Sequence, residues 1–239
     1  MSELTGEARA RYVRRMFGRI APRYDLLNRL MTFGRDRAWR VQLVLRLDLP
    51  VSPRVLDLGA GTGDLVFEAL KQRPAARAVA VDFTPEMMRI GQRRPGAERV
   101  RWVVADAAWL PFASAAFDAA VSGFLLRNVP EVDRVLTEER RVLHPGGRVA
   151  SLDTTPPSRS RLRPFLTFHL HVVIPLLGRI FAGDSEAYTY LPQSTERFLE
   201  AGALAEWMSA AGFRDVSYVR RMLGTIALHW GTHPDNLNA

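Results

Sequence analysis

The sequence Val55-Leu-Asp-Leu-Gly-Ala-Gly-Thr-Gly-Asp-Leu65 predicts a strand, a tight turn and the start of a helix in immediate succession. Gly59, Gly61 and Gly63 lie at every second position of the turn, where glycine permits positive φ angles and a close approach of a ligand to the backbone. The helix behind them offers unpaired N–H groups at its N-terminus. Asp57, two residues before the first glycine, indicates a cationic or amine-bearing ligand.

The spacing of the glycines separates two classes of nucleotide site. A dinucleotide-binding turn has its third glycine at the position that Asp64 occupies here, because a side chain there keeps the helix away from the strand. The form Asp-x-Gly-x-Gly-x-Gly instead resembles motif I of class I S-adenosylmethionine methyltransferases. A turn that only caps a helix is the alternative, although one glycine would suffice for that purpose.

Composition restricts the class of protein. The hydrophobic fraction of 47% and the charged fraction of 24% are ordinary for a folded domain. The chain has no cysteine, which excludes disulfides and thiolate metal sites, and we expect no bound metal. No apolar run is long enough for a transmembrane helix. The N-terminus does not resemble a secretory signal, so we expect a cytoplasmic protein.

The net charge of +8 comes from arginine, since Lys71 is the only lysine. The sequence has no run of basic residues interleaved with aromatic ones, so we do not expect nucleic acid as a partner. A peripheral contact with an anionic membrane surface at the inner face is the simpler interpretation of the charge. The alternative is that the arginine content reflects genomic base composition.

Apolar runs alternate with helical patterns along the chain, which predicts an α/β fold with a doubly wound, mostly parallel sheet of seven strands. We take residues 1–239 as one domain, with a helical lid at 1–50 and a helical insertion on the substrate side at 154–200. The expected strands are 54–58, 77–82, 100–106, 117–122 and 149–152, and 214–220 and 222–229 form an antiparallel pair. We expect a turn at 144–147, a helix at 131–143 and a loop across the cleft at 182–193.

Acidic residues end two of the expected strands, where open α/β sheets bind their ligands. Asp82 could accept hydrogen bonds from both ribose hydroxyls of a nucleoside, or else cap the following helix. Asp106 and Ala107 could meet an adenine amino group through side chain and backbone. These positions place a nucleoside across the carboxyl ends of the sheet.

Polar residues in two other segments are candidates for a substrate site. Tyr24, Asp25 and Asn28 lie near the helix break at Pro22 and suit a lid over the cleft. A loop after the fourth expected strand, ending near Pro130, should direct its polar residues Arg127 and Asn128 towards the same cleft. The apolar segment 165–181 could be part of the core, a pocket wall or an interfacial segment. Its two histidines, His169 and His171, have the wrong helical spacing to share a metal.

Several motifs together resemble the ubiquinone/menaquinone biosynthesis C-methyltransferase family (UbiE/MenG type), over nearly the whole chain. They are Phe17-Gly-x-Ile-Ala-x-x-Tyr-Asp25, Leu56-Asp-Leu-x-x-Gly-Thr-Gly-Asp64, Leu110-Pro-Phe112, Arg127-Asn-Val129, Arg141-Val-Leu-x-Pro-Gly-Gly147 and Ala187-Tyr-x-Tyr-Leu-Pro-x-Ser194. The resemblance implies S-adenosylmethionine as cofactor, with contacts at Thr62, Asp82, Asp106 and Ala107. The full set of residues expected at the cofactor is Asp57, Gly59, Gly61, Thr62, Gly63, Asp82, Phe83, Asp106, Ala107 and Gly123.

The chain departs from the family pattern at three positions. Gly123 stands where many members have a serine that contacts the cofactor, Leu125 stands at a family glycine, and Asp153 replaces the usual glutamate. These differences affect the expected details of the substrate more than cofactor binding.

The resemblance implies methylation of a ring carbon of a lipophilic, prenylated quinol, with demethylmenaquinol as the leading substrate. Positioning of the two reactants could supply about 7–11 kcal/mol of the barrier, and a base at the quinol hydroxyl about 10²–10⁴-fold. We expect Arg127, Asn128 and Tyr24 to bind and polarise that hydroxyl. Asp153 is a weak candidate for the base. Alternatives are another lipophilic substrate or a phospholipid amine, RNA, or a non-catalytic scaffold, and a homodimer stays open.

Overall fold

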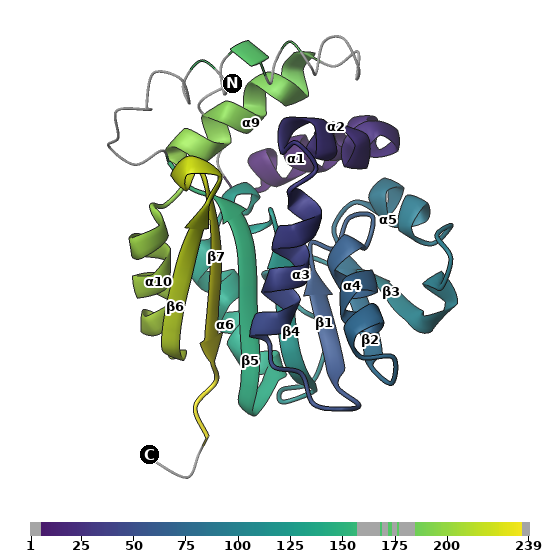
Figure 1. Ribbon diagram of the computed structural model, residues 1–239, viewed down its shortest axis with the longest axis vertical. Helices are drawn as coiled ribbons and strands as arrows, with labels where there is room; N and C mark the ends of the chain where they lie inside the picture. Colours follow the sequence, from purple (N-terminus) through teal and green to yellow (C-terminus); the bar gives the residue numbers. More distant parts are fainter. Residues whose placement is uncertain (1–5, 157–167, 169–171, 174–175, 177–184, 236–239) are drawn as a thin grey trace.

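The computed structural model describes residues 6–156, 168, 172–173, 176 and 185–235, which build a seven-stranded sheet flanked by helices (Figure 1). The strand order is β3-β2-β1-β4-β5-β7-β6, in which β1 to β5 run parallel and β7 is antiparallel to both β5 and β6. The strands are β1 Arg54–Leu58, β2 Arg77–Asp82, β3 Val100–Val104, β4 Phe117–Gly123, β5 Leu143–Thr154, β6 Arg214–Arg221 and β7 Ile226–Thr232. The predicted fold is therefore confirmed.

Helices cover both faces of the sheet, so the central strands are mostly apolar. The helices are α1 Gly6–Ile20, α2 Tyr24–Met31, α3 Asp36–Arg46, α4 Asp64–Gln72, α5 Pro85–Gly91, α6 Val132–Val142, α9 Ser185–Arg197 and α10 Ala201–Ala210. One core cluster packs α3 and α4 on the sheet around Leu43 and Val66, and the other packs α6 and α10 on the opposite face around Leu136 and Met208. None of the described helices is long and apolar enough to cross a bilayer.

The order of the strands explains where a ligand can bind. The sheet continues from β1 to β2 on one side and to β4 on the other, so the chain crosses over in opposite directions at this point. Such a crossover leaves a crevice at the carboxyl ends of β1 and β4, because the following loops diverge. The glycine turn that follows β1 lies at this crevice.

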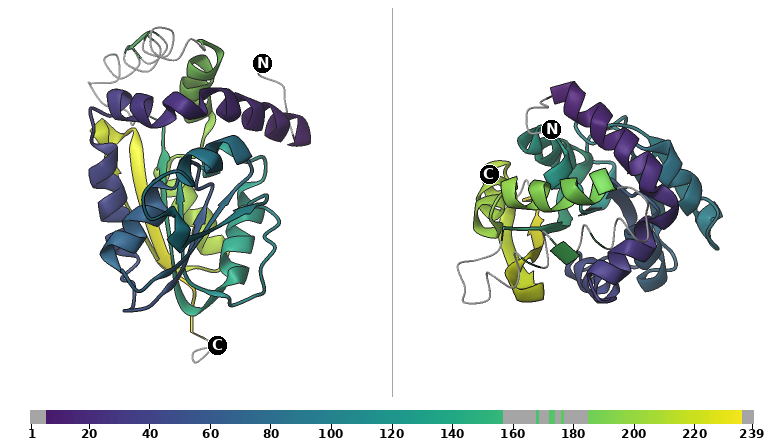
Figure 2. Two further views of the ribbon diagram at one scale, coloured as in Figure 1. Left: turned by 90° about the vertical axis from the view of Figure 1, so that its right-hand side faces the viewer. Right: turned by 90° about the horizontal axis from the view of Figure 1, so that it is seen from above.

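The N-terminal helices form a separate layer across the carboxyl ends of the strands (Figure 2). A short 3₁₀ turn with Pro22, Ala21–Arg23, joins α1 to α2, and Gly34 adopts a φ of 72° after α2. Both breaks follow the sequence prediction, because proline interrupts a helix and glycine tolerates positive φ. Met16 and Leu27 are buried in this layer and pack with α9.

Three predictions from the sequence are wrong. The strand expected at 222–229 starts only at Ile226 and runs to Thr232, because Met222–Gly224 forms a 3₁₀ turn. The segment predicted as a loop at 182–193 contains most of α9, because Tyr188 and Leu191 are buried against the apolar side of α1 and α2. Tertiary packing of this kind stabilises a helix that local composition does not favour. The turn predicted at 144–147 lies inside β5, which starts at Leu143 opposite Phe117 and passes through an irregularity before pairing regularly.

Candidate active site

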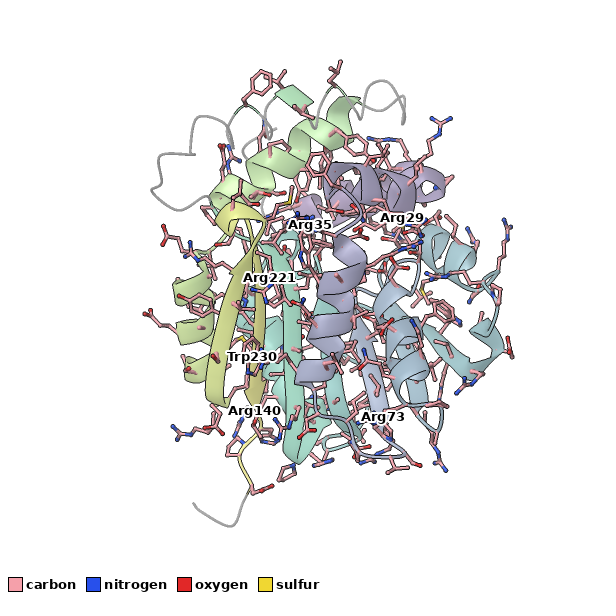
Figure 3. All side chains as sticks on the ribbon, in the orientation of Figure 1. Arg29, Arg35, Arg73, Arg140, Arg221 and Trp230 are labelled. Atoms are coloured by element: carbon pink, nitrogen blue, oxygen red, sulfur yellow. The ribbon has the colours of Figure 1, made fainter. Side chains whose placement is uncertain are left out.

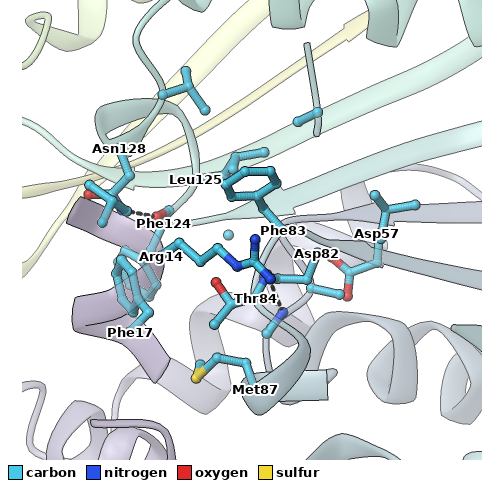
Figure 4. A pocket seen from close by; sticks show the side chains of 18 of the residues that line it. Arg14, Phe17, Asp57, Asp82, Phe83, Thr84, Met87, Phe124, Leu125 and Asn128 are labelled. Atoms are coloured by element: carbon cyan, nitrogen blue, oxygen red, sulfur yellow. Dashed lines mark hydrogen bonds between the residues drawn. The ribbon is translucent and has the colours of Figure 1, made fainter. Parts of the chain in front are cut away.

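A cavity opens at the carboxyl ends of β1, β2 and β4, beneath α1 and α2 (Figure 4). Most of the residues expected at the site line it: Tyr24, Asp57, Gly59, Gly61, Thr62, Asp82, Phe83, Asp106, Ala107, Gly123 and Asn128. Gly63 and Arg127 do not belong to the lining. The structure thus brings together residues from strand ends and from the lid that are far apart in the sequence.

The glycine turn needs its glycines for different reasons. Gly59 has a φ of 61°, and a Cβ there would lie 2.7 Å from a methyl carbon of Leu125. Gly61 has a φ of 56° and borders the cavity, where a Cβ would narrow the approach to the backbone. Gly63 caps α4 with a φ of 87°, and a Cβ there would lie 2.8 Å from Trp102. Gly63 therefore serves helix packing rather than the cavity.

Asp57 is fully buried at the end of β1, and only one of its carboxylate oxygens has a partner. Its Oδ2 accepts a hydrogen bond of 2.9 Å from the backbone N–H of Val66, near the start of α4. Its Oδ1 has no partner within the described part of the chain. Burial, and to a lesser degree the charges of Asp82 and Asp64, raises the pKa of Asp57 well above its usual value.

An unpaired buried acceptor beside a bare glycine turn fits an amine-bearing ligand. Such an acceptor costs free energy while it has no partner, and a bound ammonium group would satisfy it with a charge-assisted hydrogen bond. Asp57 and Gly61 therefore form a cradle that suits the amino-acid portion of S-adenosylmethionine.

Asp82 fixes the other side of the turn. Its Oδ2 accepts a hydrogen bond of 2.7 Å from the N–H of Gly61, and its Oδ1 accepts one of 2.6 Å from the N–H of Thr84. Burial raises its pKa, and these hydrogen bonds counteract part of the shift. Each carboxylate oxygen keeps further acceptor capacity, so Asp82 can also bind the hydroxyls of a ribose.

The end of β3 supplies the residues expected at an adenine ring. Asp106 accepts a hydrogen bond of 2.9 Å from the N–H of Ala108 through Oδ1, which fixes its side chain at the cavity wall. Ala107 is buried beside it. Phe83 lines the same end, and the guanidinium of Arg14 lies 5.2 Å from the centre of its ring.

The lid is hydrogen-bonded to the glycine turn. The hydroxyl of Thr62 donates to Oδ1 of Asp25 on α2, at 2.8 Å. Burial, together with the charge of Asp64, raises the pKa of Asp25. Tyr24 lines the cavity, and burial raises its pKa, so its phenol keeps its proton at neutral pH. Tyr24 is thus suited to hydrogen bonding rather than to proton abstraction.

Arg127 forms a buried ion pair with Asp153 rather than facing the cavity. Its Nη1 donates to Oδ1 of Asp153 at 2.6 Å, and its backbone N–H donates to Oδ2 at 3.2 Å. The N–H of Thr154 also donates to Asp153, at 2.7 Å. Because both oxygens of Asp153 are engaged with a guanidinium or the backbone, this residue is poorly suited to act as a free base.

Asn128 follows Arg127 and does face the cavity (Figure 4). Its Nδ2 donates to the backbone oxygen of Phe124 at 2.8 Å, and its Oδ1 accepts from the hydroxyl of Tyr190 on α9, at 3.2 Å. The amide is therefore held at both ends, with one N–H and one lone pair left for a ligand.

Sequence reasoning missed the residues that α1 and α5 contribute. Arg14 and Phe17 project from α1 into the cavity, and Met87 from α5 lies beside Gly61 (Figure 4). The helical periodicity of the N-terminal segment was visible in the sequence, but it does not reveal which turn of the helix crosses the cavity. The proposed pocket wall at 165–181, with His169 and His171, lies largely outside the described residues.

Two of the three departures from the family pattern, Gly123 and Leu125, lie at this cavity, whereas Asp153 is not part of its lining. The side chain of Leu125 covers Gly59, and a Cβ at Gly123 would lie 2.8 Å from Leu65. A serine at position 123 would therefore require Leu65 to move. Leu125 and Leu65 together make this wall of the cavity more apolar.

Comparisons with known proteins agree with the motifs. A family model described as the ubiE/COQ5 methyltransferase family matches residues 5–233. The chain is 45% identical to the ubiquinone/menaquinone biosynthesis C-methyltransferase UbiE of Desulfotalea psychrophila, over 92% of this chain and 89% of that protein. It is 43% identical to the demethylmenaquinone methyltransferase of Thermus thermophilus, over 92% of this chain and 100% of that protein.

Solved structures agree in fold. The [4+2]-cyclase SpnF superposes with a TM-score of 0.68 at 19% identity, covering 94% of this chain and 96% of its own. A SAM-dependent methyltransferase from Thermotoga maritima superposes with a TM-score of 0.64 at 21% identity, covering 92% and 99%. At these identities the likeness concerns the arrangement of the sheet and its helices alone.

Proposed function

Because this chain belongs to the ubiE/COQ5 methyltransferase family, we propose that it converts demethylmenaquinol to menaquinol by methylating a carbon of the quinol ring. It is a C-methyltransferase of quinone biosynthesis that depends on S-adenosylmethionine. The main support for the proposal is that two different groups of residues line one cavity. Buried acids surround a glycine turn at β1 and β2, and Tyr24 and Asn128 lie across from them with apolar neighbours.

The first half of the cavity suits S-adenosylmethionine, which supplies an electrophilic methyl group on a sulfonium ion when it is bound. We assign Asp57 to its amino group, Asp82 to its ribose hydroxyls and Asp106 with Ala107 to its adenine. Support for this assignment comes from the unpaired Oδ1 of Asp57 and from the free acceptor capacity of Asp82. These groups are fixed by backbone hydrogen bonds, so little ordering is needed on binding.

The second half of the cavity suits a quinol ring. We assign Asn128 and Tyr24 to a ring hydroxyl, Asn128 through its remaining N–H and lone pair and Tyr24 through its protonated phenol. Arg127 lies behind Asn128 and its charge is paired with Asp153, so we assign it to positioning this segment rather than to contact with the quinol.

We further propose that the lid end of the molecule contacts an anionic membrane, because the quinol is lipophilic. Leu26, Phe33 and Leu223 are exposed there by 51%, 74% and 53%, and the exposed Arg29 and Arg35 lie next to the lid helices (Figure 3). Apolar side chains among arginines suit an anionic lipid surface. We place the enzyme in the cytoplasm, in contact with the inner face of the membrane. Sedimentation with anionic and with neutral vesicles tests this contact, and equal binding to both would count against it.

Methyl transfer tests the proposed reaction directly. Purified protein with labelled S-adenosylmethionine should methylate demethylmenaquinol in preference to a demethylated benzoquinol and to a phospholipid amine. Transfer to none of the quinols would refute the proposal. The comparisons do not favour the alternatives of another lipophilic substrate, a phospholipid amine or a non-catalytic scaffold. A homodimer stays a prediction, which sedimentation equilibrium would test.

A further inference from the structure

A second cavity lies next to the reaction cavity, and we propose that it binds the isoprenoid tail of the quinol substrate. This inference rests on the proposed function, since it concerns where the rest of that substrate goes. The second cavity is enclosed by α1, α9, α10 and the start of α6. Its lining includes Tyr12, Leu126, Tyr190, Phe198, Leu199 and Trp207.

The two cavities adjoin along one short segment. Val129 and Pro130 line both of them. Asn128 faces the reaction cavity, Tyr190 faces the second cavity, and the hydrogen bond between their side chains spans the wall. A ring held at Asn128 therefore has its nearest apolar exit over Val129 and Pro130.

The distribution of acidic and apolar residues in the reaction cavity also favours a tail that leaves over Val129 and Pro130. The acids assigned to the cofactor lie at the ends of β1, β2 and β3, whereas Val129 and Pro130 follow β4 on the opposite side of β1. The lid helix α1 covers the cavity from above with apolar residues that include Val13 and Phe17. An apolar tail that turned towards the acids would desolvate them without a partner, which is unfavourable.

The lining of the second cavity is mostly apolar, as an isoprenoid tail requires. Aromatic and aliphatic side chains predominate, and the described lining contains no carboxylate. Its floor includes Arg127, whose charge is paired with Asp153 and whose backbone oxygen accepts a hydrogen bond of 2.9 Å from Arg9. Arg197 on α9 also lines this cavity and is exposed. It could contact the headgroups of the anionic lipid surface at which the tail enters the protein.

Filling the second cavity should affect only substrates that have a tail. Val132→Trp and Leu199→Trp each add bulk at a half-buried position of this cavity, and neither residue lines the reaction cavity. Val51→Trp is the matched control, because Val51 is exposed in a loop outside both cavities. The substrates are demethylated naphthoquinols with no tail, one isoprene unit, and several units.

For the wild type and Val51→Trp we expect kcat/KM to rise with tail length. Each buried CH₂ contributes roughly a fourfold gain in binding, so losing part of one isoprene unit should cost about tenfold. The two filling variants should therefore lose about tenfold or more with the long tail and stay within about twofold of the wild type with the tail-less quinol. Affinity for S-adenosylmethionine, measured by calorimetry, should not change.

Equal losses with and without a tail, or no loss with a tail, would overturn the assignment. Absence of transfer by the wild type to every quinol would instead overturn the proposed function. A second measurement uses the wild-type protein and does not depend on how the variants fold. A quinol with a photoreactive diazirine near the end of its tail should label peptides from 190–207, and labelling confined to other segments would also overturn the assignment.

Discussion

Replacement of Asp57 by asparagine should change two measurable properties through one atom, the unpaired Oδ1. The change keeps the shape of the side chain and the acceptor for the N–H of Val66. It removes the charge whose burial raises the pKa of Asp57. The pH dependence of folding stability and the binding of S-adenosylmethionine should therefore both respond.

The sign of the stability effect follows from the direction of the pKa shift. The folded pKa of Asp57 lies above its unfolded value, so the folded protein binds the proton more tightly. At pH values below the unfolded pKa, Asp57 does not lower the free energy of unfolding. As the pH rises from there towards the folded pKa, that free energy falls by about 1.4 kcal/mol per pH unit. D57N should remove this slope. The cost of the new buried amide does not depend on pH, so it cancels when the stability of D57N at one pH is compared with its stability at another.

Urea unfolding of the ligand-free protein at several pH values measures this slope. With 239 residues, each kcal/mol corresponds to roughly 2–4 °C in melting temperature, so thermal scans are a second measure. Asp133→Asn is the matched control, since Asp133 is exposed on α6. Its pH profile should match that of the wild type.

Binding of S-adenosylmethionine gives the second readout. A hydrogen bond between charged groups contributes about 1.5–3 kcal/mol, so D57N should raise the dissociation constant roughly 10–150-fold. In the wild type, an ammonium group at Oδ1 would lower the pKa of Asp57, so binding should release a proton. Calorimetry in buffers of different ionisation enthalpy detects this release. An unchanged affinity and an unchanged proton release in D57N would refute the role given to Asp57.

Three further predictions concern the neighbourhood of the cavity. Gly59→Ala should lower the free energy of unfolding by about 1–2 kcal/mol because of the positive φ alone, and by more because its Cβ would contact Leu125. Adding Leu125→Gly should restore part of this loss, as measured by urea unfolding. Arg127→Met should destabilise by about 3–5 kcal/mol by leaving Asp153 unpaired, whereas Arg127→Met with Asp153→Leu should recover most of the stability without recovering methyl transfer. Glu139 is buried, and desolvation raises its pKa to about 8, so the wild type should lose stability on the order of 5 kcal/mol as the pH rises from 4.5 to 8. Glu139→Gln should abolish this loss, which urea unfolding of both proteins at each pH would measure.

The sequence was sufficient for the central sheet because local patterns determine those elements. β1 and β2 have the predicted bounds, since each is an apolar run that ends in an acid at a turn. α9 could not be predicted in the same way. Its Tyr188 is buried by contacts with α1 and α2, far away in the chain, and composition alone favoured a loop.

The candidate site was predictable to the extent that it lies at strand ends. Asp57, Asp82 and Asp106 end or follow β1, β2 and β3, and parallel strands bring their carboxyl ends to one edge. The partners of these acids were not predictable. Whether an oxygen of Asp57 stays unpaired depends on how α4 starts, and the Asp25–Thr62 hydrogen bond depends on where the lid settles.

The direction of Arg127 shows why a residue can be expected near a site and yet face away from it. The segment predicted as a loop contains a 3₁₀ turn, Leu126–Asn128, in which residues three apart share a side. Leu125 and Asn128 accordingly line the reaction cavity, Leu126 and Arg127 line the second cavity, and Val129 lines both. The guanidinium of Arg127 is paired with Asp153 and lies 5.0 Å from the centre of the ring of Phe124, three residues earlier. Under the two proposals above, one three-residue turn separates the ring site, the tail site and the buried ion pair of Arg127 and Asp153.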